Sequence, residues 1–542
     1  MKKTLPWIAP LWFGLAACGG SGAGASSASP DRGGAGWTEV ASPHFTLRTD
    51  LDEKTAQDVS SQLETMFSSL LELGFDSALG SATEMRTHVD VVYFHDRAEY
   101  TRVAPKLSAG VFRREFHDFE STPITILYGD VVQRTREILQ HELTHFFVHA
   151  YYPQAPIWLN EGLAEYFSTL ELDDGAAVLG RQPKGLRFWK NDWHSENVDG
   201  EVRTSIPMSE ALSVGTLLGM DVQAFEGMSD ADPHSPAGIK ASQAMATHYA
   251  SAWTLVHLLM TNRNYRPRFD AYRRRLLEGA AADTAWAETV GQLPLPALES
   301  AYTDSLVTFE INMQRTRYEA PRNSAPRVRQ LSDADVHVMR ARLRSWDTPE
   351  ERAAAEADMK EAATREPLHP GLAVLEAYWR AQQHDLAGAA KAIEPALAAR
   401  PNDAHLLNAL GWVQLRRIAK KEQPAAALDP VAAKLAPVAT TATQLDLLAQ
   451  SRAVHEDLDA ALAFEKRATL ADPSCYACFF HASTLLDAQG RVREALQAAT
   501  LAVHMLPDGI RAPAMTAQIA QYRRRLSEKD GGSLSAPKPP TR

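Results

Sequence analysis

The sequence predicts an α+β domain followed by an all-α array of helical repeats. Between residues 37 and 130, short β-rich runs alternate with segments whose apolar residues recur at helical spacing, which indicates a small sheet with helices. Beyond residue 330 the chain is rich in Ala and Leu, and prolines recur at intervals of 34, 36, 36 and 34 residues. A fixed period of this length is typical of repeat proteins. The spaced prolines are Pro367, Pro401, Pro437, Pro473 and Pro507.

Residues 1–18 have the pattern of an export signal. Lys2 and Lys3 precede an apolar run over residues 5–15, and the sequence Leu-Ala-Ala-Cys ends at Cys18. The run is shorter than the about 20 residues that a bilayer span needs. The pattern resembles a bacterial lipoprotein signal, which implies that Cys18 becomes the lipidated first residue of the mature chain. An ordinary secretory signal with an incidental cysteine is the alternative. Gly19 stands where inner-membrane retention signals carry Asp, which implies the outer membrane or its periplasmic face.

Residues 19–36 are rich in Gly, Ser and Ala and have no apolar periodicity, so we expect a flexible tether. The net charge of −11 argues against a nucleic-acid partner, because phosphate binding needs a concentrated basic face. The shares of apolar residues (45%) and charged residues (23%) are those of ordinary globular proteins. We therefore expect membrane attachment through the lipid alone.

In the α+β domain, β-rich runs predict strands at 45–48, 88–94 and 123–129, and apolar spacing predicts a helix over 54–73. The later part of this domain is predicted to be helical, with a loop-rich insertion over 173–237. The expected helices there are 132–150, 156–172, 242–260, 269–277 and 296–314.

The helix predicted over 132–150 contains the motif His141-Glu142-Leu143-Thr144-His145. Residues four apart lie on one face of a helix, so both imidazoles point to one place, as a zinc site requires. Glu142 lies about 100° around the helix from His141, beside such a metal, where it can accept a proton from water. Sixteen positions after His145, Glu161 lies in the sequence Asn-Glu-Gly-Leu-Ala-Glu-Tyr of the next predicted helix.

This pair of motifs resembles the gluzincin zinc peptidases, the group of thermolysin and the neutral aminopeptidases, and is most similar to the bacterial peptidase-MA-like family. The resemblance implies a thermolysin-like zincin domain over residues 37–317. It also implies one Zn²⁺ per chain, bound by His141, His145 and Glu161, with Glu142 as the catalytic base that deprotonates zinc-activated water. The spacing from His145 to Glu161 is a few residues shorter than in thermolysin, so a tight turn over 151–156 must join the two helices.

Two further residues are candidates for the site. Glu165 lies one helical turn after Glu161, where related peptidases place a carboxylate that orients a histidine ligand from the second shell; a solvated helix charge is the alternative. Tyr249 precedes an apolar helix, as does the tyrosine that donates to the oxyanion in related aminopeptidases; an ordinary core tyrosine is the alternative, and His248 is a weaker candidate donor. His149 is expected to be structural.

Peptides are the expected substrates. The Gly-x-Met-Glu-Asn motif that holds a free N-terminus in the aminopeptidases is not found before His141, so an endopeptidase is the better interpretation. The strand over 124–128 is expected to lie beside the cleft and to pair with an extended peptide.

Residues 318–330, which include Pro321 and Pro326, are predicted to be a linker with few contacts. Beyond it, alanines recur twelve and five positions before four of the spaced prolines, a pattern that resembles tetratricopeptide repeats over residues 331–510. That resemblance implies a solenoid that binds a protein partner. Cys475 and Cys478 either pack as two small residues or form a local disulfide. Residues 531–542 are expected to be disordered.

Two functions fit these patterns. The first is a lipid-anchored zinc peptidase whose repeats recruit protein substrates or partners. The second is a non-catalytic binding or assembly lipoprotein in which the repeats carry the function. An intact Glu142 favours the peptidase, because a scaffold has no need of a base beside the metal.

The lipoprotein signal makes a testable prediction. Cys18→Ser should move the protein from the membrane fraction to the soluble fraction, because lipid on Cys18 is the only expected attachment. Fractionation with a high-salt wash measures this, with Ser21→Ala in the tether as the matched control. A Cys18→Ser protein that still sediments with washed membranes would contradict the prediction.

Overall fold

The computed structural model describes residues 36–529 apart from several short gaps. The gaps are residues 77–87, 105–109, 116–118, 121, 130–132, 153, 174, 184–185, 190–192, 199–200, 222–223, 226–234, 308–312, 320–324, 345, 347, 473 and 505–512. The expected signal at 1–18, with Cys18, and the expected disordered tail at 531–542 lie outside the described residues, as does all but the last residue of the tether.

A six-stranded sheet organises the N-terminal part, in the order β12-β1-β2-β3-β5-β4. Strands β2, β3 and β5 run parallel, and the remaining pairings are antiparallel. β3 is buried along its whole length, as expected for a central strand with both faces covered. The strands are β1 (Thr38–Ala41), β2 (Phe45–Thr49), β3 (Val89–Phe94), β4 (Gly110–Glu115), β5 (Thr122–Tyr128) and β12 (Arg327–Gln330).

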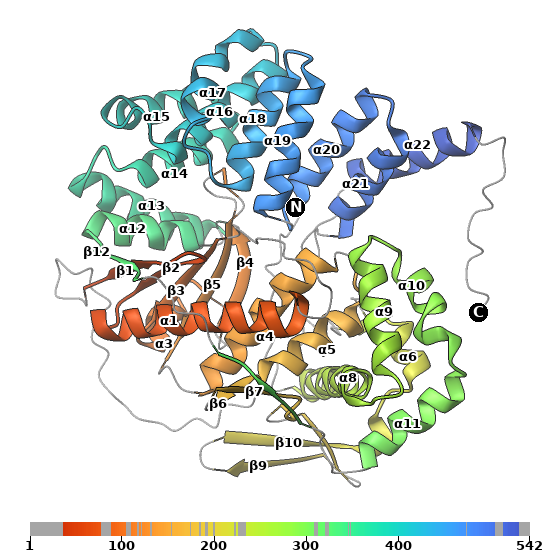
Figure 1. The fold of residues 1–542 in the computed structure, drawn as a ribbon. Coiled ribbons are helices and arrows are strands. Elements are labelled where there is room, and N and C mark those ends of the chain that lie inside the picture. Colours follow the sequence, from red (N-terminus) through yellow and green to blue (C-terminus); the bar gives the residue numbers. More distant parts are fainter. Residues whose placement is uncertain are drawn as a thin grey trace.

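Alternation of side chains along the strands gives the sheet two apolar faces. On one face, Leu47, Val91 and Tyr93 belong to a large core that also contains α1 (Glu53–Leu70) and α4 (Gln133–Tyr151). On the other face, Val92 and Ile124 pack with residues of α12 (Asp333–Leu343). Figure 1 shows α1 and α12 on opposite sides of the sheet.

The prediction of a linker over 318–330 is wrong in its last part. Residues 327–330 form strand β12, which pairs with β1. Leu331, and Met339 of the next helix α12, belong to the core on one face of the sheet. Sequence alone favoured a linker because β12 is short and mostly exposed, with three of its four side chains outward. The two parts of the chain are therefore joined by a shared strand and a shared core, and the expectation of few contacts is wrong as well.

Ion pairs reinforce this junction. Asp90 on β3 accepts hydrogen bonds from Arg48 Nη1 at 3.1 Å and from Arg342 Nη1 of α12 at 2.8 Å. Arg340 Nη2 donates to Glu99 Oε2 at 3.2 Å. Burial would raise the pKa of Asp90, but the charges of Arg48 and Arg342 outweigh it and hold that pKa well below its ordinary value.

The helices expected after residue 131 are present, but α8 begins six residues earlier than expected, and α11 ends at Val307 instead of 314, where Gln314 begins a strand. They are α4, α5 (Ile157–Ser168), α8 (Pro236–Thr261), α9 (Arg266–Leu277) and α11 (Leu295–Val307), with the shorter α10 (Ala282–Glu288). Other short helices of this part are η2 (Leu71–Asp76), α3 (Arg97–Tyr100), η3 (Met208–Glu210), α6 (Val214–Leu218) and η4 (Val290–Gln292).

The segment expected to be a loop-rich insertion contains regular structure instead. Two three-stranded sheets form there, in the orders β8-β10-β9 and β11-β7-β6. Apart from β10, their strands have only three to five residues, too few for a clear sequence pattern, and β11 comes from much later in the chain. The strands are β6 (Glu171–Asp173), β7 (Ala176–Leu179), β8 (Arg187–Trp189), β9 (His194–Val198), β10 (Glu201–Pro207) and β11 (Gln314–Arg317).

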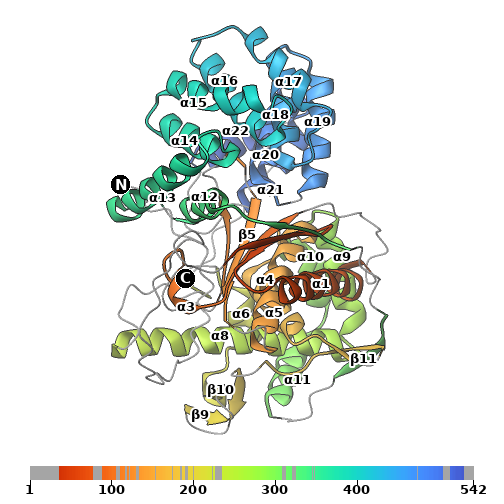
Figure 2. The ribbon, with the colours of Figure 1, turned by 90° about the vertical axis from the view of Figure 1, so that its left-hand side faces the viewer.

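The C-terminal part is an array of helix pairs, which confirms the predicted helical repeats. Figure 2 shows them stacked above the sheet. The array extends past residue 510, since a last helix ends at Lys529. Its helices are α12, α13 (Pro349–Arg365), α14 (Pro370–Gln382), α15 (Leu386–Ala399), α16 (Ala404–Ala419), η5 (Ala425–Ala427), α17 (Asp429–Leu435), α18 (Ala442–Ala453), α19 (Leu458–Ala471), α20 (Tyr476–Ala488), α21 (Val492–His504) and α22 (Pro513–Lys529).

The alanine register of the repeats has a packing role. All eight predicted alanines are buried, because neighbouring helices approach closely only where side chains are small. They are Ala355, Ala362, Ala389, Ala396, Ala461, Ala468, Ala495 and Ala502. Cys475 and Cys478 form a disulfide, which decides between the two alternatives for this pair. Among the described residues, none of the helices combines the length and the apolar character that a bilayer span requires.

Asp90→Asn should lower the free energy of unfolding by about 3 kcal/mol at pH 7, because two partly buried guanidinium groups lose their counter-charge. Since the folded pKa of Asp90 is lowered, its contribution is complete above about pH 5 and is lost progressively as the pH falls from about 4 toward the much lower folded pKa. Urea unfolding of wild type and variant at about pH 7 and about pH 2 tests both points, with exposed Asp58→Asn as control. A difference that is unchanged at about pH 2 would contradict the assignment.

Candidate metal centre

Helices α4 and α5 hold the motif residues at the centre of the large core. Leu143, Phe146 and Phe147 bury one side of α4, and Leu159, Leu163 and Phe167 bury α5. His141, His145 and Glu161 are themselves only 2%, 4% and 2% exposed. The apolar packing of these two helices therefore brings polar residues of both into the interior, where they need partners.

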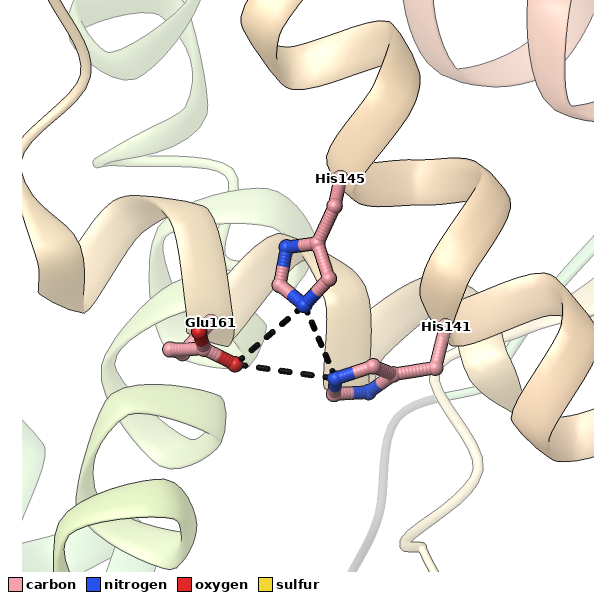
Figure 3. A group of neighbouring side chains, drawn as sticks. All are labelled: His141, His145 and Glu161. Atoms are coloured by element: carbon pink, nitrogen blue, oxygen red, sulfur yellow. Dashed lines mark hydrogen bonds and ion pairs between the residues drawn. The ribbon is translucent and has the colours of Figure 1, made fainter. Parts of the chain in front are cut away.

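Three ligand atoms converge between the two helices (Figure 3). His141 Nε2 and His145 Nε2 are 3.0 Å apart, and Glu161 Oε2 lies 3.6 Å from the first and 3.5 Å from the second. The structure thus brings together the three residues that the sequence predicted as ligands. Within the described residues these atoms form a group whose members all lie within 4.8 Å of one another, close enough to hold one metal ion.

The far nitrogens of both imidazoles have acceptors. His141 Nδ1 lies 3.5 Å from Glu165 Oε1, and His145 Nδ1 lies 3.0 Å from Asn160 Oδ1. If each Nδ1 carries the proton that it directs at its oxygen, each Nε2 is left with a lone pair facing the other. Glu165 therefore occupies the position expected of a residue that orients a ligand.

Asn160 is a site residue that the sequence analysis missed. It immediately precedes Glu161 in the motif of α5, but its role depends on the 3.0 Å contact to a histidine on another helix. The signal was present, since an amide buried beside a ligand usually has a hydrogen-bonding task.

The three ligand atoms are all acceptors, so their arrangement suits a bound metal ion better than hydrogen bonds among themselves. Glu161 Oε2 is buried and has no hydrogen-bond donor among the described residues. Two lone pairs 3.0 Å apart repel unless a proton or a cation lies between them. Two neutral imidazoles and one carboxylate are the ligand set of catalytic zinc sites, so these residues suit Zn²⁺.

Electrostatics also favour a cation. Burial and the charge of Glu161 raise the pKa of Glu142 to about 8, and burial with neighbouring carboxylates raises that of Glu165 to about 8. Burial lowers the pKa of His141 to about 4, so it is neutral at pH 7. No lysine or arginine is among the described groups that shift the pKa of Glu142, Glu161 or Glu165. A divalent cation would supply the positive charge that keeps these carboxylates ionised.

Tyr249 lies at the same centre. Its hydroxyl hydrogen-bonds to Glu161 and its ring centroid is 6.4 Å from that of His141. Gly162 makes this possible, because a Cβ there would come within 2.6 Å of Val256 and 2.8 Å of the Ala252 carbonyl on α8. Glycine thus lets α8 approach α5 closely enough for Tyr249 to reach the ligand.

The weaker histidine candidates lie elsewhere. His248 Nδ1 is 2.6 Å from the Phe225 carbonyl, which gives it a structural hydrogen bond. His149 is half-buried near the end of α4 and is not part of the ligand group.

A second group of metal-ligand type, which the sequence analysis did not predict, lies in the repeats. It consists of Asp446, Glu465 and His481 on three neighbouring helices. His481 Nδ1 lies 2.8 Å from Asp446 Oδ1, and this charge raises the pKa of His481 despite its burial. Burial and the charge of Asp446 raise the pKa of Glu465 well above its ordinary value. Both shifts favour the protonated forms of His481 and Glu465, and protons here offset the charge of Asp446 without a metal.

Comparisons with known proteins identify no family. No family model matches the chain, and no curated protein matches it. Solved structures similar to part of the chain include PilW, a widely conserved type IV pilus biogenesis factor, with 16% identity and a TM-score of 0.29. That match covers 37% of this chain and 94% of PilW. Two structures of MamA, each 16% identical with a TM-score of 0.22, cover 31% and 28% of this chain and 97% and 94% of their own.

The outer contact of His145 can be tested through metal affinity. Asn160→Ala should weaken zinc binding about 10- to 100-fold, as loss of a group that orients a ligand does, whereas Glu161→Ala should remove high-affinity binding altogether. Competition with a chromophoric chelator measures both, and exposed Asn402→Ala is the matched control. Unchanged affinity in Glu161→Ala would exclude Glu161 as the third ligand.

Proposed function

We propose that this chain is a zinc-dependent peptidase. The observation that supports this most is the convergence of His141 Nε2, His145 Nε2 and Glu161 Oε2, with an ionisable Glu142 within electrostatic range of Glu161. The motif order and the position of Glu165 add to it. The peptidase activity, the bound zinc and the roles of the individual residues are all parts of this proposal.

Each residue then has a distinct task. Zinc held by the three ligands would supply Lewis acidity and make water acidic enough to ionise near neutral pH. Glu142 accepts the proton of the attacking water and returns it to the leaving amine. The Tyr249 hydroxyl donates a hydrogen bond to the oxyanion that develops on the peptide carbonyl. Glu165 and Asn160 hold the two imidazoles in the orientation that leaves each Nε2 free for the metal.

The substrate would be an extended peptide segment. The sequence analysis placed it beside the strand over 124–128, but β5 lies inside the sheet, paired on both sides with β3 and β4. The described sheet has two edge strands, β12 and β4, and β4 is the one next to β5. A peptide that pairs with β4 gains backbone hydrogen bonds along its length, which suits an endopeptidase.

The location and partners are proposed from the sequence. Lipid on Cys18 would hold the chain at the bacterial outer membrane or its periplasmic face, with the 19–36 segment as a tether. The helical repeats would recruit protein substrates or partners, as stacked helix pairs offer an extended surface for binding.

Burial of the centre favours a second candidate function. His141, Glu142, His145 and Glu161 are each less than 5% exposed, which also suits a metal that only stabilises the fold. In that case the chain would be a non-catalytic binding or assembly lipoprotein with the repeats as its functional part.

Glu142→Gln separates the two candidates. The change keeps the size of the side chain and removes the base, so hydrolysis of an unstructured peptide should fall at least ~100-fold while zinc stays bound. Kinetic assays together with zinc analysis measure this, and exposed Glu53→Gln is the matched control. A wild-type chain that binds zinc and cleaves no unstructured protein would favour the second candidate.

A further inference from the structure

A two-residue segment of the N-terminal part lies against the inner side of the repeats. Phe119 and Glu120 belong to the connection between β4 and β5, two strands that extend toward the repeats (Figure 1). Phe119 contacts α14 and α16, and Glu120 contacts α16 and α18, which are the first helices of successive pairs. We call this contact surface the inner face; its residues are Tyr378, His405, Asn408, Arg416 and Gln444.

The Glu120 carboxylate is recognised by side chains of two helices. Its Oε1 accepts a hydrogen bond from Gln444 Nε2 at 2.9 Å and from Asn408 Nδ2 at 3.5 Å, and it lies 3.4 Å from His405 Nδ1. Glu120 is only 7% exposed. Burial would raise its pKa, but His405 and Gln444 outweigh this effect and lower the pKa. His405 and Gln444 of the inner face therefore stabilise a buried carboxylate, and the charge of Arg342 also lowers its pKa.

Phe119 is held by its ring and by its backbone. Its ring centroid is 5.5 Å from that of Tyr378, and the Arg416 guanidinium lies 5.5 Å from it. Its carbonyl accepts a hydrogen bond from Asn408 Nδ2 at 3.3 Å. Phe119 also has a φ of 62°, a conformation that a bulky residue rarely adopts and that surrounding contacts must compensate.

The inner face has the properties of a peptide-binding site. Asn408 is completely buried on α16, where an unpaired N–H donor would be costly, and its Nδ2 donates to the segment's backbone and carboxylate. A donor that binds a main-chain carbonyl can recognise a peptide backbone whatever its side chains. The Tyr378 ring with Arg416, and Gln444 with His405, then select an aromatic side chain and a carboxylate.

We propose that the inner face is a binding site for a bent segment in which an aromatic residue is followed by a carboxylate, and that Phe119 and Glu120 occupy it within the same chain. A partner protein that carries such a segment competes with them. This inference rests on the proposed protein-binding role of the repeats and does not depend on the metal centre.

A labelled peptide of residues 115–124 tests the proposal by fluorescence anisotropy. The receptor is the full chain with Phe119→Ala and Glu120→Gln, which vacates the site, in a Glu142→Gln background that prevents hydrolysis. This protein should bind the peptide at least ~10-fold more tightly than the chain with its own segment intact, because an attached segment competes at an effective concentration of about millimolar. A peptide with the same two substitutions should not bind.

Arg416→Ala in the vacated chain should weaken binding about three-fold, because it removes the cation above the aromatic ring. Arg467→Ala is the matched control. It removes an exposed arginine of α19, which lies 5.2 Å from the Phe464 ring of the same helix and away from the inner face. If the doubly substituted chain does not fold, Phe119→Ala alone provides the same comparison, because Phe119 is only half-buried. Equal affinity of the vacated and intact chains, or equal binding of the substituted peptide, would overturn the proposal. Because the readout is binding in a Glu142→Gln background, failure of the proposed peptidase activity would not change the result of this test.

Discussion

The N-terminal part depends on one electrostatic constraint: Nε2 of His141, Nε2 of His145 and Oε2 of Glu161 meet in a buried space, and Glu161 Oε2 has no hydrogen-bond donor among the described groups. Packing of α4 on α5 makes this meeting unavoidable, because the same helices that bury Phe146 and Phe167 carry the ligands inward. A cation removes the repulsion, and it also lowers the raised pKa of Glu142 toward the range in which a base is ionised. Gly162 then brings α8, and with it Tyr249, within reach.

The same domain is tied to the repeats at two places. Strand β12 forms one edge of the sheet, and helix α12 covers one of its faces. There Asp90 forms ion pairs with both Arg48 and Arg342. Phe119 and Glu120, which follow the edge strand β4 in the chain, contact the repeats at the opposite edge of the sheet from β12. A partner that displaced this pair would release the connection next to the strand at which we propose that substrate pairs.

The candidate site could be predicted largely from the sequence, because helical periodicity determines which side chains share a face. His141 and His145 needed only their spacing of four residues, and the burial of Ala355 or Ala461 followed from the repeat period. Asn160, Phe119 and Glu120 could not be found in this way, since their roles arise from contacts between segments far apart in the chain. The same reason explains why β12 was missed. Its four mostly exposed residues have no strand pattern in the sequence, and they form a strand by pairing with β1, which is far away in the chain.

The central claim is that the three convergent atoms bind a metal. Crystals of the full chain grown with zinc, with diffraction recorded on both sides of the zinc absorption edge, test it directly. The account predicts an anomalous peak between His141, His145 and Glu161, and its disappearance in crystals of Glu161→Ala. No peak at this position, or a peak only at Asp446, Glu465 and His481, would contradict it.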